Sequence, residues 1–388
     1  MEWADVMMKR AIKIINVVGA RPNFMKIAPI MCEMRKNEKI IPLLVHTGQH
    51  YDEQMSKLFF DDLEIPEPDI NLEVGSGSQA EQTAEIMKRF EPILVKERPD
   101  YILVVGDVNS TIACALTAVK LGIKIIHVEA GLRSFDRTMP EEINRVLTDA
   151  ISDFLFITER NAQENLLKEG NSKDKIHFVG NVMIDTLIRN TDKARQTDIH
   201  RRLGLNPGNQ ILPYGVLTLH RPSNVDDSRN LESILQAVNT LSKEVPIIFP
   251  AHPRTRNNIG RFGFSHFFEN VEAGTTTQKR NSKGIRMIEP LGYLDFLHLM
   301  AESKVVLTDS GGMQEETTVL QIPCLTLREN TERPVTVSEG TNSVVGINRE
   351  NIIAQGLAIL RGNLKLGRIP ELWDGRAAER IVKIILKQ

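Results

Sequence analysis

The chain has 388 residues, more than the roughly 250–300 at which a single hydrophobic core usually stops growing, so we expect two domains. Hydrophobic residues make up 41% and charged residues 25% of the chain, which is ordinary for a globular protein and excludes a disordered or fibrous one. The formal net charge of -2 gives no sign that the protein binds nucleic acid or a membrane surface.

Three cysteines lie far apart, at Cys32, Cys114 and Cys324, without a CxxC pair. This spacing favours a reducing compartment and argues against both a disulfide framework and a structural zinc site. No run of 18 apolar residues occurs, and the N-terminal segment lacks the apolar stretch of a secretion signal. We therefore expect a cytoplasmic protein without a bound metal.

Short β-branched runs alternate with longer amphipathic stretches along the first half of the chain. The runs typical of strands are Ile12–Val18, Ile40–His46, Tyr101–Val105, Lys124–Val128, Phe154–Thr158 and Ile176–Val179. Helical patterns lie between them, for example at Gln79–Lys96, Asn109–Leu121 and Glu141–Ile151. This alternation predicts an α/β fold with a doubly wound parallel sheet.

A polar segment at 195–210, which contains Asn206-Pro207-Gly208, predicts a linker. A second series of strands is expected at Tyr214–Leu219, Pro246–Phe249, Ile285–Glu289, Val305–Thr308 and Cys324–Leu327. We thus predict a Rossmann-like domain over residues 10–190, completed by a C-terminal helix within 373–388, and a second Rossmann-like domain over 200–370. Two such domains suit the binding of a ligand between them.

Polar residues follow the predicted strands in both halves of the chain. Because ligands of open parallel sheets bind at the carboxyl ends of the strands, these residues are candidates for a binding site. They are Arg21, the segment His46 to His50, Asp107, Glu129, His220, His252 and Asp309. Their equivalent positions in both halves suggest two rims of one site.

The segment Thr308 to Glu316 follows a predicted strand and opens a helix. Gly311 and Gly312 would let a phosphate approach free backbone N–H groups, and Ser310 could add a hydroxyl donor. The alternative is a tight turn in which Asp309 or Ser310 caps the helix. Neither GxGxxG nor GxxxxGK[ST] occurs, so the sequence indicates neither a dinucleotide cofactor nor ATP hydrolysis.

Several charged residues complete the candidate site. Arg21 and Lys26 flank the first strand-to-helix turn, with solvated surface charges as the alternative. The pair His220-Arg221 could donate to a diphosphate, with a purely structural role as the alternative. Three acids are candidates for proton transfer, and each has a structural alternative. Asp107 could cap a helix, and Glu129 could pair with Arg133. Glu141 could lie at the start of a helix only because the helix dipole favours acids there.

In their order and spacing, these segments resemble the motifs of the non-hydrolysing UDP-N-acetylglucosamine 2-epimerases. The resemblance extends from Ile12 to about Ile385, and its most specific parts are the segments HVEAGLR and TDSGGMQEE. The matching segments are residues 19–26, 46–50, 106–111, 127–133, 140–145, 219–221 and 308–316. The resemblance implies a GT-B glycosyltransferase-like fold, a homodimer, the substrates UDP-GlcNAc and UDP-ManNAc, and no cofactor.

The resemblance also implies a role for individual residues. Asp107, Glu129 and Glu141 match the catalytic acids, and His220 matches the histidine that serves the diphosphate as UDP departs. The phosphate contacts of the family are matched by Arg21, Ser310, Gly311 and Gly312. Glu316 matches the acid that holds the ribose, Phe296 a position near the uracil, and Lys26 a position on the sugar side. Gln49 and His50 match a second UDP-GlcNAc site that activates bacterial relatives.

Two departures from the family pattern leave the sugar open. Asn23 replaces a common glutamate, and Pro222-Ser223-Asn224 replaces the usual residues after the histidine. Relatives that act on UDP-2,3-diacetamido-glucuronic acid are therefore an alternative. A hydrolysing epimerase, a GT-B glycosyltransferase and a non-catalytic nucleotide-sugar sensor are further alternatives, although three acids in the first half of the chain do not suit a transferase or a sensor.

Overall fold

The computed structural model describes residues 11–48, 67–269 and 283–388, which form two compact units. The first unit comprises the described residues up to Thr186 together with Glu371–Gln388, and the second comprises those within Leu187–Pro370. The boundary falls inside helix α7 (Val182–Ala194). The polar segment 195–210 therefore belongs to the second unit, where it contains the short helix α8 (Ile199–Arg202).

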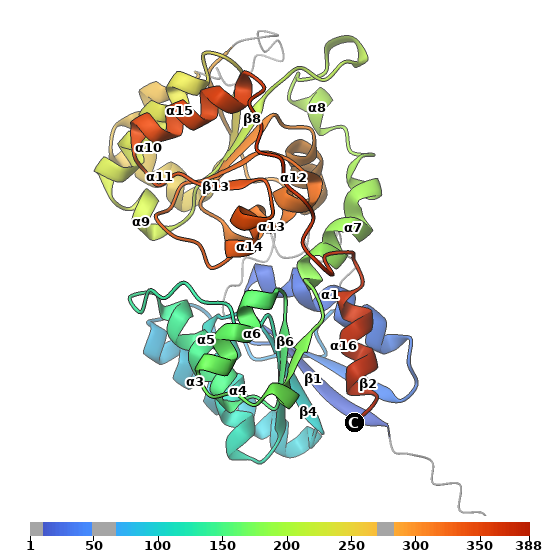
Figure 1. Cartoon of the computed structure of the whole chain (residues 1–388). Coiled ribbons are helices and arrows are strands. Elements are labelled where there is room, and N and C mark those ends of the chain that lie inside the picture. The colour runs from blue at the N-terminus through green and yellow to red at the C-terminus, as the bar shows by residue number, and fades with distance from the viewer. Residues whose placement is uncertain (1–10, 49–66, 270–282) are drawn as a thin grey trace, which may run out of the picture. The chain divides into compact units, whose positions relative to one another are not determined.

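The first unit is built on a seven-stranded parallel sheet with the order β3-β2-β1-β4-β5-β6-β7 (Figure 1). Its strands are β1 (Ile12–Val18), β2 (Ile40–His46), β3 (Ile70–Asn71), β4 (Tyr101–Val105), β5 (Lys124–Val128), β6 (Phe154–Ile157) and β7 (Ile176–Phe178). The bounds of β1, β2, β4 and β5 are those predicted from the sequence. The strand order reverses between β1 and β4, the place where ligands bind in such sheets.

The helices of the first unit cover both faces of its sheet. Helices α3, α4 and α5 pack beside one another, and α1 packs against the C-terminal helix α16 (Figure 1). The bounds are α1 (Arg21–Arg35), α3 (Gln79–Glu97), α4 (Asn109–Lys120), α5 (Pro140–Ile151), α6 (Arg160–Lys168), the 3-10 helix η1 (Lys173–Lys175) and α16 (Ala377–Ile385). A capping box formed by Ser78 and Glu81 begins α3.

Two buried side chains hold the end of the chain against the first unit. The Trp373 indole N–H donates to the carbonyl of Thr158 at 3.0 Å. The Asp185 carboxylate accepts from the backbone N–H groups of Ala377 and Ala378 at 3.0 and 2.7 Å, which caps α16. Helix α16 therefore begins a few residues later than the predicted start at Trp373, because residues 373–376 form a turn before the cap.

The second unit is built on a six-stranded parallel sheet with the order β10-β9-β8-β11-β12-β13. Its strands are β8 (Gly215–Thr218), β9 (Ile247–Pro250), β10 (Ile285–Ile288), β11 (Val305–Thr308), β12 (Cys324–Thr326) and β13 (Asn342–Val344). Its other elements are η2 (Pro207–Asn209), α9 (Pro222–Val225), α10 (Ser228–Leu241), α11 (Pro253–Arg261), η3 (Phe264–Phe267), α12 (Tyr293–Ala301), α13 (Gly311–Leu320), α14 (Pro334–Ser338) and α15 (Arg349–Leu360). The order reverses between β8 and β11, so the predicted doubly wound parallel fold is confirmed for both units.

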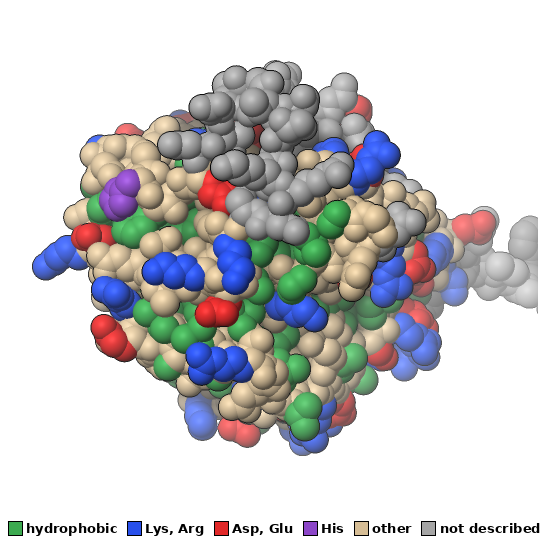
Figure 2. All heavy atoms as spheres, turned by 90° about the horizontal axis from the view of Figure 1, so that it is seen from above, with side chains coloured by type: hydrophobic (Ala, Val, Ile, Leu, Met, Phe, Trp, Pro, Cys, Tyr) green, Lys and Arg blue, Asp and Glu red, His purple; other side chains and the backbone are tan. Residues whose placement is uncertain are grey.

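Each unit has its own hydrophobic core, made by its sheet and the helices that cover it. Lys and Arg side chains are interspersed with Asp and Glu on the face seen in Figure 2. None of the described helices is long and apolar enough to cross a membrane.

Candidate active site

A buried ion pair lies where β5 ends. Glu129 directly follows β5 and is 4% exposed, and the Lys26 ammonium, from the second turn of α1, contacts its carboxylate. The alternative partner, Arg133, instead binds Asp149 and Glu169. Glu129 also has a φ of +73°, a left-handed conformation that is strained for a residue with a side chain. A strained, buried carboxylate paired with a lysine is typical of a functional group rather than of a stabilising one.

Gly106, at the end of β4, lies against this ion pair. A Cβ atom at Gly106 would come within 3.2 Å of Lys26 Nζ and 3.4 Å of Glu129 Oε2, and its φ is +66°. A side chain here would be strained by the backbone and crowded by the pair. The glycine therefore lets the turn that carries Asp107 pass close to Glu129.

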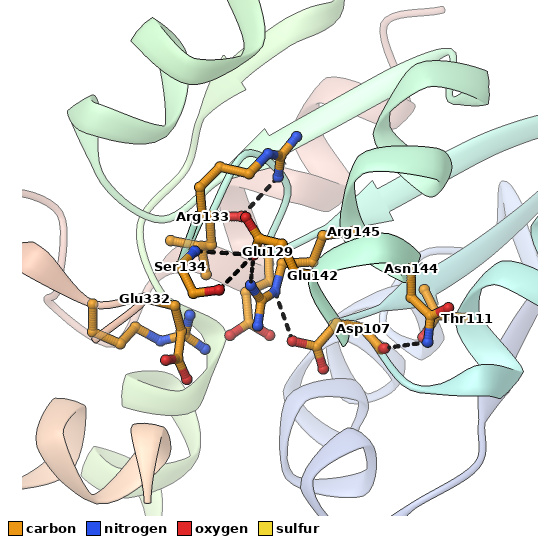
Figure 3. A network of polar contacts seen from close by, with 12 residues as sticks. Asp107, Thr111, Glu129, Arg133, Ser134, Glu142, Asn144, Arg145 and Glu332 are labelled. Atoms are coloured by element: carbon orange, nitrogen blue, oxygen red, sulfur yellow. Dashed lines mark hydrogen bonds and ion pairs between the residues drawn. The ribbon is translucent and has the colours of Figure 1, made fainter. Parts of the chain in front are cut away.

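Asp107 does not cap α4, because the N-cap position belongs to Val108. Its carboxylate accepts from Arg145 Nε at 2.8 Å and is 27% exposed (Figure 3). The Asn144 side chain donates to the Asp107 carbonyl at 2.9 Å. Asp107 is thus held by α5 from two sides while its carboxylate stays accessible.

The two adjacent acids of α5 have different environments. Glu142 is buried, contacts Arg145, and accepts from the N–H groups of Ser134 and Phe135, each at 2.9 Å (Figure 3). Glu141 is half-buried, and its carboxylate forms no hydrogen bond or ion pair with the rest of the described chain. Glu142 therefore has a structural role, whereas Glu141 keeps a carboxylate that is available to a substrate.

The turn between β1 and α1 is closely packed against α4. A Cβ atom at Gly19 would lie 2.0 Å from Ser110 Oγ, so only glycine fits there. Asn23 accepts from the Ala20 N–H and donates to the Val105 carbonyl, both at 2.9 Å. Asn23, the residue that departs from the family pattern, thus joins β1, α1 and β4 at the point where the strand order reverses.

Three of the residues predicted from the sequence cannot be placed fully. Arg21 is the first residue of α1, but its side chain is not described. Gln49 and His50 lie outside the described residues.

In the second unit, His220 is oriented by Asp309. The imidazole Nδ1 lies 2.8 Å from an oxygen of the Asp309 carboxylate, which also accepts from the N–H groups of His220 and Arg221. Burial raises the pKa of Asp309, but its contacts with His220 and Arg221 outweigh burial, so the net pKa is below the usual range. Asp309 is fully buried while the His220 side chain is 50% exposed. The exposed imidazole is therefore held with Nε2 directed away from Asp309.

At the N-terminus of α13 the Ser310 N–H donates to the Thr308 hydroxyl at 3.0 Å, and the N–H groups of Gly311 and Gly312 follow it. Ser310 occupies the N-cap position, but its hydroxyl forms no capping hydrogen bond, and Asp309 is engaged by His220. The capping alternative for this segment is therefore not realised. Ser310, Gly311 and Gly312 have the arrangement that suits an anion at a helix N-terminus.

Arg328, which was not predicted from the sequence, lies beside this helix end together with Arg221. The buried Glu332 carboxylate binds Arg328 Nη2 at 2.8 Å and lies 3.5 Å from Arg221 Nη2. A Cβ atom at Gly311 would come within 2.7 Å of the same carboxylate. Burial raises the pKa of Glu332, but Arg333, Arg328 and Arg221 outweigh it and hold the net pKa well below its usual range. The signal in the sequence was the charged run 328–333, which follows β12 at its carboxyl end.

Glu316 and Phe296 lie on the adjacent helices α13 and α12. Glu316 is 4% exposed and accepts from the Tyr293 hydroxyl at 3.0 Å. Burial raises the pKa of Glu316 to about 7, although the hydrogen bond from Tyr293 lowers it. Phe296 is half-buried and lies one helical turn beyond Tyr293. With a pKa of about 7, the carboxyl group of Glu316 is partly protonated near neutral pH, and hydroxyl groups that donate to it favour its ionised form.

The chemistry available in the two units is different. The first unit offers carboxylates at Asp107, Glu129 and Glu141 with a lysine among them, which suits proton transfer and the stabilisation of positive charge. The second offers a helix N-terminus, an oriented histidine and arginines, which suits a diphosphate. No group of three His, Cys, Asp or Glu side chains that could hold a metal occurs within residues 11–48, 67–269 and 283–388.

Comparison with known proteins decides the family. The model of the family described as UDP-N-acetylglucosamine 2-epimerase matches residues 32–386. The chain belongs to this family. The UDP-N-acetylglucosamine 2-epimerases of Methanococcus maripaludis and Methanocaldococcus jannaschii are 43% and 42% identical to it over 376 and 378 residues, and each alignment covers 96% of this chain and 98% of the relative.

Solved structures of the family support the same fold. The crystal structure of Methanocaldococcus jannaschii UDP-GlcNAc 2-epimerase in complex with UDP-GlcNAc and UDP superposes with a TM-score of 0.86 at 41% identity, and the match covers 97% of this chain and 100% of that one. The two parallel-sheet α/β domains are therefore the GT-B-like fold predicted from the sequence.

Proposed function

We propose that this chain interconverts UDP-GlcNAc and UDP-ManNAc by epimerisation at C2 of the sugar. The observation that carries the proposal is the match to the family over residues 32–386, a range that contains the acids Asp107, Glu129 and Glu141 together with His220 and the start of α13. The Methanocaldococcus jannaschii structure with UDP-GlcNAc and UDP supports the same substrate.

The chemistry of the sugar explains why such residues are needed. The C2 proton has no neighbouring carbonyl to activate it, so direct abstraction would be slow. When the C1–O bond breaks, its electron pair goes to the β-phosphate oxygen and C1 gains oxocarbenium character. A carboxylate then removes the C2 proton, which leaves UDP and 2-acetamidoglucal. Protonation of C2 from the other face and return of UDP to C1 give the second epimer.

We assign the proton transfer and the charge stabilisation to Asp107, Glu129 and Glu141. Asp107 and Glu141 have accessible carboxylates, and Glu129 forms a buried pair with Lys26. Which of the three removes the C2 proton is left to the variants described in the Discussion.

We assign the binding of UDP to residues of the second unit. The diphosphate binds the N–H groups of Gly311 and Gly312 and the hydroxyl of Ser310. A phosphate contact is also assigned to Arg21. His220, held by Asp309, donates to the leaving phosphate oxygen, which stabilises the charge that develops there. Glu316 accepts from the ribose hydroxyls, and Phe296 lies near the uracil.

The direct test of this function is the product formed from UDP-GlcNAc alone, without added NAD or metal. UDP-ManNAc as the product, with the UDP moiety still attached, supports the proposal. Free ManNAc would indicate a hydrolysing enzyme. No turnover of UDP-GlcNAc, with turnover of UDP-2,3-diacetamido-glucuronic acid, would assign the enzyme to the related sugar.

The raised pKa of Glu316 predicts that binding of a UDP-sugar strengthens with pH. The ribose hydroxyls donate to the ionised carboxylate, so below a pKa of about 7 the protein must release a proton on binding. Affinity for UDP-GlcNAc, measured by calorimetry with an Asp107→Asn variant that does not turn it over, should therefore rise about tenfold between about pH 6 and pH 8. Glu316→Gln should remove this dependence, and an equal dependence in that variant would contradict the role of Glu316.

We also propose that Gln49 and His50, whose structure is not described, belong to a second UDP-GlcNAc site that activates the enzyme. Pure UDP-ManNAc should then react with a lag, and a trace of UDP-GlcNAc should remove the lag. A coupling of typical size, about 5- to 150-fold in activity, would be visible, and Gln49→Ala should weaken it more than it weakens UDP binding. Prompt, linear turnover of UDP-ManNAc alone would show that the two residues do not form an activating site.

A cytoplasmic homodimer is the form of the enzyme we propose. The three cysteines are free thiols, which fits a reducing compartment. Ile143 and Leu147, one turn apart on α5, are 47% and 50% exposed, and a second copy of the chain would cover them. Leu147→Glu should then shift the mass measured by light scattering from dimer to monomer, whereas an unchanged mass would exclude this part of α5 from the interface.

A further inference from the structure

A fully buried histidine, His127, lies on β5 with both ring nitrogens against oxygen atoms. Nδ1 is 2.6 Å from Asp149 Oδ1, and Nε2 is 2.9 Å from the carbonyl oxygen of Gly106. A carbonyl oxygen only accepts, so Nε2 must carry a hydrogen. The short contact between Nδ1 and Asp149 fixes the orientation of the ring.

We propose that His127 positions the Gly106–Asp107 turn for catalysis, through the hydrogen bond that Nε2–H donates to the Gly106 carbonyl. The proposal rests on the proposed epimerase function.

The other ring nitrogen of His127 is held by Asp149. Asp149 Oδ2 accepts from Arg133 Nη2 at 2.7 Å and from the Gly131 N–H at 3.0 Å, and Arg133 also binds Glu169. The ring of His127 is therefore fixed between this buried network and the Gly106 carbonyl.

The peptide that His127 holds leads directly to the candidate acid Asp107. The Gly106 N–H donates to the Val128 carbonyl at 3.1 Å, and the Gly106 carbonyl accepts from His127, so the turn is fixed on both sides of this residue. The Cα of Gly106 faces the Lys26–Glu129 pair, and Asp107 is the next residue. Loss of the bond from His127 would remove one of these two contacts with β5 and let Asp107 shift relative to Glu129.

The hydrogen on Nε2 is tested on the wild-type protein by nitrogen NMR of its histidine rings. The chain has nine histidines, and the signals of His127 are those lost in His127→Gln. Nε2 of His127 should have the chemical shift of an N–H group, because it donates to the Gly106 carbonyl. An unprotonated Nε2 would overturn this hydrogen bond and with it the positioning role.

The positioning role is tested by two substitutions at the same site. The amide of His127→Gln can still donate to the Gly106 carbonyl, whereas His127→Leu removes both hydrogen bonds. His127→Leu should lower kcat by about 10- to 100-fold, the effect of a small displacement of catalytic groups, and His127→Gln should lower it less, with UDP affinity unchanged in both. Wild-type kcat in the folded Leu variant would overturn the role.

The outcomes separate this proposal from the proposed function. If the Leu variant does not fold, the comparison of the Gln variant with wild type decides: a Gln variant with wild-type kcat overturns the role. If wild type itself does not epimerise UDP-GlcNAc, the proposed function fails, while the NMR result still decides whether His127 donates to Gly106.

Discussion

Asp107→Asn, Glu129→Gln and Glu141→Gln are each expected to lower kcat for epimerisation by about 10²-fold or more, the usual loss when a positioned acid or base is removed. UDP binding should change little, because the residues assigned to UDP lie mainly in the second unit. The measurement is kcat from initial rates, with UDP affinity from calorimetry on the same preparations. If all three variants show normal kcat and only a tenfold rise in KM, the acids hold the substrate and do not transfer protons.

The Glu129 variant needs a control for stability. Glu129→Gln leaves the buried Lys26 ammonium without its counter-charge, and breaking a buried pair typically costs about 3–5 kcal/mol of stability. The double variant Lys26→Met/Glu129→Gln should regain thermal stability without regaining kcat. Glu91→Gln, an exposed acid on α3, is the matched control and should behave as wild type.

Asp309→Asn is expected to lower kcat by about 10- to 100-fold, because His220 loses the carboxylate that orients its ring. If Asp309 acts through His220, the double variant Asp309→Asn/His220→Asn should be no slower than His220→Asn alone. The coupling is read from the four kcat values of this cycle. If the kcat losses of the two single variants multiply in the double variant, Asp309 acts independently of His220, for example by holding the backbone of Arg221.

The framework of both units could be predicted from local patterns. Strand β11, for example, is a buried β-branched run, and its bounds were predicted correctly at Val305–Thr308. The short strands β3 and β13 escaped prediction because their two or three residues carry no alternation of apolar and polar side chains. The sequence of helix α1 contains Pro22 and Pro29, which weaken its helical signal. Pro22 is tolerated because the N–H groups of the first turn have no partner within the helix.

The partners of the candidate residues could not be predicted, since they depend on contacts between distant segments. Glu129 pairs with Lys26, 103 residues away, rather than with the nearby Arg133. The sequence also does not distinguish Glu141 from Glu142, because only the fold of the loop at Ser134 shows which of the two is buried. Asp309 was predicted to lie in the binding site, with a helix cap as the alternative, but its contact with His220, which follows the neighbouring strand of the sheet, could not be predicted.

The measurement that tests the central claim most directly is epimerisation of UDP-GlcNAc in D2O, followed by proton NMR. Elimination and re-addition break the C2–H bond in every catalytic cycle and return a proton from a group that exchanges with solvent. The account therefore predicts that UDP-ManNAc forms with deuterium at C2, and that deuterium also enters C2 of the remaining UDP-GlcNAc. Retention of the C2 proton in the epimer, or release of free ManNAc in amounts equal to the substrate consumed, would contradict it.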